Sequence, residues 1–110
     1  MNPSHAVDGL GRDAVVALLV EGVRSRLEEQ GEPAPPDLGE GTRLVGERAA
    51  LGSLALVSLI VEVEQTLEDE HGVSVTLADE RAMSQKQSPF RTVGTLADYV
   101  MQLVREQGNA

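Results

Sequence analysis

The fold is decided by one stretch of the chain, GSLALVSLIVEVEQTLEDEHG, which spans residues 52–72. Its apolar side chains recur every three or four residues, and that spacing gathers them on one face of an α-helix. The members of this face are Leu56, Leu59, Ile60, Val63 and Leu67. Gly72 is a typical helix stop, and His71 in the last turn suits the negative end of the helix dipole. The sequence therefore predicts a helix from about Ser53 to His71.

A narrower apolar strip follows one edge of this face. At about 100° per residue, Leu54, Val57 and Val61 lie beside the buried arc. Glu64 and Glu68 are next to them on the same side of the helix. We therefore expect a partly exposed apolar strip that is bordered by acids.

Two more helices are predicted, one on each side of this stretch. Apolar residues at helical spacing between Arg12 and Gln30 predict the first, and Gly31 follows its end. Its apolar positions, with one glycine, are Val15, Leu18, Leu19, Gly22, Val23 and Leu27. The last helix begins with Thr92 as its cap and ends at Gly108. Its apolar positions are Val93, Leu96, Ala97, Val100, Met101, Leu103 and Val104.

The segments between the helices are predicted to be irregular. Prolines and glycines break the long loop over residues 32–52. Three apolar residues of this loop are expected to return to the core: Leu44, Val45 and Leu51. Residues 73–77 alternate like a strand, but no other segment pairs with them, so we interpret them as an extended connector. A short helix near residues 79–83 and a turn anchored by Phe90 precede the last helix.

These elements predict the fold class and the domain organisation. Three main helices plus one short helix make a small all-α four-helix bundle, with a long loop between helices 1 and 2. At 110 residues the chain fits one domain. We assign a flexible N-terminal tail to residues 1–11, a single domain to residues 12–107 and a C-terminal tail to residues 108–110.

The net charge of −9 is concentrated in one part of the chain. Residues 49–80 contain seven acids and no Lys or Arg. Such a field repels phosphate backbones and attracts basic protein surfaces. Phe90 and Tyr99 are the only aromatic residues, which leaves no platform on which bases could stack. We therefore expect basic protein partners and no nucleic acid.

The compartment follows from what the sequence lacks. There is no cysteine, so disulfides and thiolate metal sites are excluded. The longest apolar run, residues 14–20, is too short to span a bilayer. The first residues do not combine a basic region with an apolar one, as a secretion signal does. We expect a cytoplasmic monomer that does not insert into membranes.

Residues suited to catalysis are scarce. A Ser/His/Asp hydrolase would need Ser53 beside a histidine. His71 is far along the same predicted helix, roughly 27 Å away at about 1.5 Å per residue. The acidic run over residues 68–70 lacks the alternating oxygen ligands of a calcium loop. We therefore predict no enzyme and no metal site, although turnover by the purified chain would revive an enzymatic function.

Ser53 itself has two interpretations. A serine at the start of an apolar helix is commonly its N-cap. The N-terminal amides of a helix also favour a phosphodiester attached at that point. From the residues alone, both interpretations stay open.

Two stretches of the chain resemble the acyl carrier protein family. LGSLALVSLIVEVE, residues 51–64, is similar to the region that carries the prosthetic group in that family, which has an Asp-Ser-Leu motif and a Val/Leu-spaced helix with Glu near its middle. TVGTLADYV, residues 92–100, is similar to the family's last helix, with its Thr-Val start and Asp-Tyr-Ile/Val end. The two matches have the right separation, and the order of elements agrees over residues 12–107.

The resemblance implies a function. A 4'-phosphopantetheine arm on Ser53 would carry an acyl or aminoacyl group as a thioester, and the reactive sulfur would belong to the cofactor. Docking is implied for Leu54, Val57, Val61 and Glu64. The implied partners are a phosphopantetheinyl transferase and acyl-activating and acyl-transferring enzymes with basic docking surfaces. The chain itself would be a phosphoprotein without catalytic residues.

Three features depart from the family pattern. Gly52 stands where the family has the Asp that helps the transferase recognise its substrate. Ala55 and Ser58 stand where acids are common, and residues 73–91 form a longer segment than in carriers of fatty-acid synthesis. These departures indicate a carrier for specialised lipid or polyketide biosynthesis rather than for central fatty-acid synthesis. The alternative is an unmodified carrier-like bundle that acts as a protein-interaction module.

Overall fold

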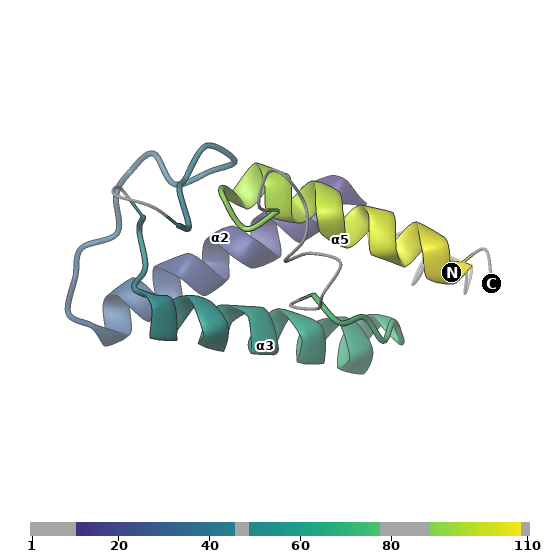
Figure 1. Ribbon diagram of the computed structural model, residues 1–110. Helices are drawn as coiled ribbons and strands as arrows, with labels where there is room; N and C mark the ends of the chain where they lie inside the picture. The colour runs from purple at the N-terminus through teal and green to yellow at the C-terminus, as the bar shows by residue number, and fades with distance from the viewer. Residues whose placement is uncertain (1–10, 46–48, 78–88, 109–110) are drawn as a thin grey trace, which may run out of the picture.

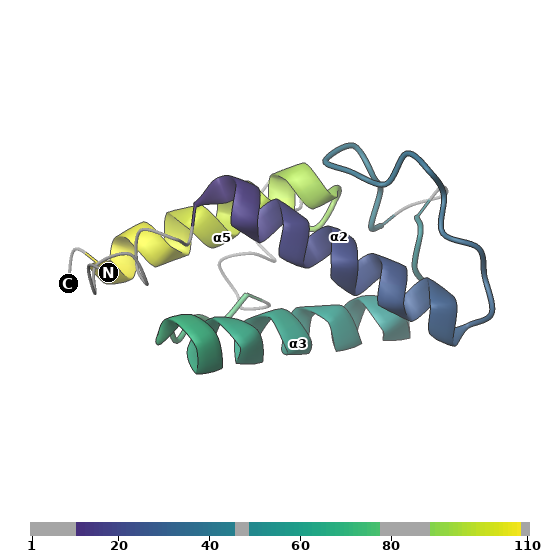
Figure 2. The same cartoon turned by 180° about the vertical axis from the view of Figure 1, so that it is seen from behind.

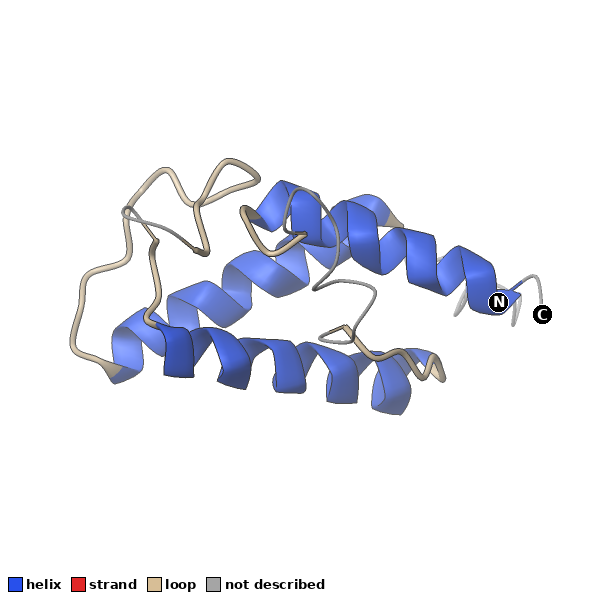
Figure 3. Ribbon diagram, in the orientation of Figure 1, coloured by secondary structure: helices blue, strands red, loops and turns tan. Residues whose placement is uncertain are grey.

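The computed structural model of the chain describes residues 11–45, 49–77 and 89–108. Its regular structure consists of three α-helices, labelled as in Figure 1: α2 (Arg12–Glu29), α3 (Ser53–His71) and α5 (Val93–Gly108). The described residues contain no β-strand (Figure 3), only an isolated antiparallel bridge between Arg43 and Thr92. The all-α class, the three main helices and the long first loop are confirmed. The short helix predicted near residues 79–83 lies outside the described residues, as do residues 1–10 of the predicted tail.

Helix α2 lies between the other two helices. It packs against both α3 and α5, and the two opposite views show it crossing between them (Figures 1 and 2). The fully buried side chains on the three helices form the centre of the core: Val15, Leu19, Val23, Leu59, Val63, Leu67, Val93, Leu96, Ala97 and Val100. The apolar faces that the sequence predicted for the three helices therefore meet around α2.

The helix ends follow the local sequence. Helix α2 ends before Gly31, which has a φ of 75°, and α3 ends at Gly72, which has a φ of 66°. A left-handed residue at this point lets the chain leave a helix, and glycine adopts it without strain. Helix α5 begins with a reciprocal cap: the Thr95 N–H donates to Thr92 Oγ1 at 3.1 Å, and the Thr92 N–H donates to Thr95 Oγ1 at 3.0 Å. The predicted cap at Thr92 is confirmed.

The long loop returns to the start of α5. The Leu44 N–H donates to the Arg91 carbonyl at 2.9 Å, and the Gly94 N–H donates to the Glu40 carbonyl at 2.9 Å. A Cβ at position 94 would lie 3.2 Å from that carbonyl oxygen, which is a tight contact, so the close approach favours glycine. Three loop residues contact the core as predicted: Leu44 and Leu51, which are buried, and Val45, which is partly buried.

Arg12, the first residue of α2, forms ion pairs with this loop and with α5. Its guanidinium lies 2.7 Å from a Glu40 carboxylate oxygen and 2.7 Å from an Asp98 carboxylate oxygen. Because it receives the Arg12 hydrogen bond, the Glu40 carboxyl has a pKa below its ordinary value of 4.5. The start of α2, the long loop and α5 therefore share one exposed ion-pair cluster.

This cluster predicts a pH dependence of stability. A carboxyl whose pKa is lowered by folding contributes stability that is present above about pH 4.5 and is lost as the pH falls through the lowered pKa. Glu40→Gln should therefore flatten the decline of the free energy of unfolding between pH 5 and pH 3, measured by urea denaturation. The control is Glu29→Gln, an exposed acid of α2 with no ion pair among the described residues. An equal flattening by both variants would contradict the role of the Arg12 contact.

Candidate functional site

Ser53 is the first residue of α3, as the sequence predicted. Gly52 precedes it as the N-cap in an extended conformation, and no side chain caps the helix there. A Cβ at Gly52 would meet nothing within 4 Å, and its φ of −73° suits any residue. An aspartate at position 52 would therefore fit without strain.

The apolar strip, defined as Leu54, Val57 and Val61, is exposed. Leu54 has a relative exposure of 85%, Val57 of 56% and Val61 of 47%. On the opposite side of the same helix, Leu59 and Val63 are buried. The prediction of an exposed strip is confirmed. It starts at the residue after Ser53 and runs two turns along α3, so it adjoins the candidate attachment point.

Glu64, the fourth predicted docking residue, has a contact within the protein. Its carboxylate accepts a hydrogen bond of 2.7 Å from the backbone N–H of Leu77. Leu77 is fully buried, and Val73 and Val75 are partly buried against the core. Residues 73–77 belong to neither a helix nor a strand, so the prediction of a connector rather than a strand is confirmed. Glu64 therefore holds this connector against α3, a role that the sequence did not predict.

This contact gives a local prediction. Glu64→Ala removes the acceptor of the Leu77 N–H, so hydrogen exchange of that amide should become at least about tenfold faster, since exchange follows local opening. Glu64→Gln keeps a carbonyl acceptor and should have a smaller effect. Amide exchange followed by NMR measures both. If Glu68→Ala accelerated Leu77 exchange as much as Glu64→Ala, the specific contact would be refuted.

A buried arginine joins α2 to α3. Arg26 donates to Glu62 Oε1 at 2.7 Å, to the Gly22 carbonyl at 3.2 Å and to the Ser58 carbonyl and hydroxyl at 3.2 and 3.1 Å. The sequence analysis missed this residue. A signal was present, because Arg26 follows Gly22 by four positions and Leu19 by seven, which places it on the buried stripe.

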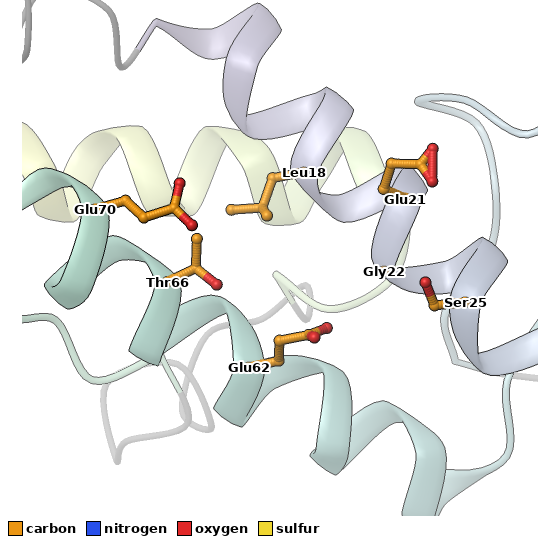
Figure 4. Close-up of a pocket in the computed structure, with 7 residues that line it drawn as sticks. All are labelled: Leu18, Glu21, Gly22, Ser25, Glu62, Thr66 and Glu70. Carbon is orange, nitrogen blue, oxygen red and sulfur yellow. The ribbon is translucent and has the colours of Figure 1, made fainter. Parts of the chain in front are cut away.

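A cleft of about 190 Å³ lies beside this contact, between α2 and α3 (Figure 4). Its walls are Leu18, Glu21, Gly22 and Ser25 from α2 and Glu62, Thr66 and Glu70 from α3.

Among the described residues, no group of three or more acids or histidines could hold a metal ion. Ser53 and His71 are the first and last residues of α3, so this helix holds them at opposite ends. The two residues are therefore too far apart to share a proton, as the sequence predicted.

Comparisons of the chain with protein-family models, with curated proteins and with solved structures found no match. In the part of the chain that the structure describes, none of the helices has the length and apolar character that a bilayer span requires.

Proposed function

We propose that the protein is an acyl carrier, with a 4'-phosphopantetheine arm on Ser53 that holds an acyl or aminoacyl group as a thioester. The observation that carries the proposal is the apolar strip, which is exposed and starts beside Ser53. Exposed apolar side chains in a row are characteristic of a protein-binding surface. An arm attached at Ser53 would project from the edge of that surface.

The chemistry assigned to Ser53 is compatible with its place in the fold. The first amides of α3 have no carbonyl acceptors within the helix, and the helix dipole favours negative charge at this end. A phosphodiester on Ser53 would be stabilised there. The thiol of the arm supplies the reactive group, so the chain needs only to present the arm and to bind enzymes.

The surroundings of Ser53 favour a specialised role. Gly52, which carries no charge, stands directly before Ser53, so a transferase that depends on an acid before the serine would act slowly. We propose that a phosphopantetheinyl transferase and a dedicated acyl- or aminoacyl-activating enzyme act on this carrier in the cytoplasm, where it works as a monomer. Its pathway would belong to specialised lipid or polyketide biosynthesis.

Modification in vitro tests the proposal. The purified chain is incubated with coenzyme A and a broad-specificity phosphopantetheinyl transferase, and its intact mass is measured. We expect an increase equal to one phosphopantetheine, which Ser53→Ala abolishes and Ser58→Ala leaves in place. Gly52→Asp supplies the acid that the carrier family has before the serine, and the position accepts the side chain. This variant should therefore be modified faster. No mass increase with several transferases, for the wild type and for Gly52→Asp, would refute it.

The alternative is an unmodified interaction module, favoured by Gly52. Glycine is an adequate helix cap but offers no charge to a transferase. If a transferase modified Gly52→Asp but not the wild type, this result would favour the unmodified interaction module.

A further inference from the structure

Arg26 is the only charged residue that is buried among those that the structure describes, with a relative exposure of 9%. Its Nη1 donates to Glu62 Oε1 and to the Gly22 carbonyl, and its Nη2 donates to the carbonyl and the hydroxyl of Ser58. Its Nε–H is buried as well but has no acceptor in the described part of the chain. Buried polar groups nearly always have a hydrogen-bond partner, so this unpaired donor points to a further acceptor.

The unpaired donor lies on the edge of the guanidinium that also carries Nη2. The N–H bonds of Nε and Nη2 point the same way from this edge and form a fork, which matches two oxygens of a carboxylate or phosphate group. Ser58 contacts only the Nη2 half of the fork. Ser58 is itself an exposed residue, so the fork lies where the buried arginine meets solvent. A group could therefore be added to the Ser58 hydroxyl from outside.

A phosphoryl group on Ser58 would supply the acceptor that Nε lacks. It adds three strong acceptor oxygens and a charge of about −2 at pH 7. Ser58 Oγ already lies 3.1 Å from Nη2, so oxygens attached through it are close enough to reach both donors of the fork. Glu62 would keep its bond to Nη1. The guanidinium would then lie between two anions and reduce the repulsion between them.

We propose that Ser58 is a phosphorylation site and that the Nε–Nη2 edge of Arg26 binds the phosphoryl group. A protein kinase would transfer the terminal phosphoryl group of a nucleoside triphosphate to Ser58 Oγ. The new O–P bond forms as the bond from that phosphorus to its bridging oxygen breaks; the nucleoside diphosphate leaves with the electron pair, and a base of the kinase takes the hydroxyl proton. The modification adds negative charge to the exposed side of α3 and a contact between α3 and α2. It does not depend on an arm at Ser53.

Two phosphorylated proteins test the binding by Arg26. Phosphoserine is incorporated during translation at position 58 in one protein and at position 74 in the other, and each phosphate is titrated by ³¹P NMR. Ser74 is the matched control, since it is exposed and has no contact with an arginine among the described residues. A free phosphoserine has its second pKa at about 6. We expect the phosphate on Ser58 to titrate about one pH unit below the phosphate on Ser74, because the guanidinium stabilises the dianion.

The Nε–H of Arg26 reports the same contact from the other side. Its exchange with water, measured by ¹⁵N-resolved NMR, should be at least about tenfold slower when Ser58 is phosphorylated than when Ser74 is, because the donor gains a charged acceptor. Arg26→Lys keeps the positive charge but lacks the fork. In this variant the titration of the phosphate on Ser58 should return at least halfway to that of the phosphate on Ser74. Circular dichroism verifies that the variant is folded, and the first two measurements do not require it.

Protein purified from its own cells in the presence of phosphatase inhibitors tests whether the site is used. We expect part of the population to carry one phosphoryl group, which tandem mass spectrometry places on Ser58. A phosphoryl group and a phosphopantetheine differ in mass, so the result for Ser58 is independent of the result for Ser53. Equal titration of the two phosphates, an Nε–H exchange rate that phosphorylation of Ser58 leaves unchanged, or a native protein without phosphate on Ser58 would each overturn the inference.

Discussion

Leu59→Ala is expected to lower the free energy of unfolding by about 3 kcal/mol, as is typical when a fully buried leucine is truncated. Leu59 has no exposed surface, and its side chain lies against Gly22 of α2. A Cβ built on Gly22 of α2 would overlap Leu59 Cδ1. The leucine therefore fills the space that the glycine leaves. Urea denaturation monitored by circular dichroism measures the loss.

The same contact predicts that one substitution changes the sign of its effect. Gly22→Ala in the wild type should cost about 1 kcal/mol, since overpacking outweighs the gain in helix propensity. In the Leu59→Ala background the methyl group has room, so Gly22→Ala should stabilise the protein by up to about 1 kcal/mol. The two substitutions are therefore coupled. Purely additive free energies would show that α2 and α3 do not meet at these residues.

Glu62→Ala is expected to cost about 2 kcal/mol, which is large for an acid that is about half exposed. Glu62 is the carboxylate partner of Arg26, whose side chain is only 10% exposed. Removing the acid leaves a buried guanidinium without its counter-charge, and such a loss is costly. This loss of stability is smaller than that expected for a fully buried ion pair because water reaches Glu62.

Removal of the buried charge should rescue this loss. In the Arg26→Met background, Glu62→Ala should cost less than about 0.5 kcal/mol, because no unpaired cation remains. Glu21→Ala is the matched control: its ion pair with Arg24 is exposed and within one helix, so its effect should stay within about 0.5 kcal/mol. If Glu62→Ala lowered the free energy of unfolding equally in the wild type and in Arg26→Met, the dependence on the buried charge would be contradicted.

The parts of the fold that the sequence predicted are those set by local periodicity. The apolar spacing and Gly72 defined α3 to the residue. The same helical wheel separated Leu59, which is buried, from Leu54, which is exposed. Both results depend only on the geometry of one helix.

The parts of the structure that the sequence did not predict depend on contacts between distant segments of the chain. The sequence did not indicate a role for Arg26, because the acceptors that surround it come mainly from α3. The Glu64 contact with Leu77 and the pairing of Leu44 with Arg91 join residues whose proximity no periodicity reveals. For the site, the exposure of the strip was predictable, whereas the contact of Glu64 with Leu77 depends on the path of the connector.

The most direct test of the proposed carrier function is the intact mass of the protein purified from its own cells, with peptide mapping of the modified residue. The account predicts a mass higher than that of the chain by one phosphopantetheine, with or without a bound acyl group, and places the addition on Ser53. A population that has only the mass of the unmodified chain, or a phosphopantetheine at another residue, would contradict it.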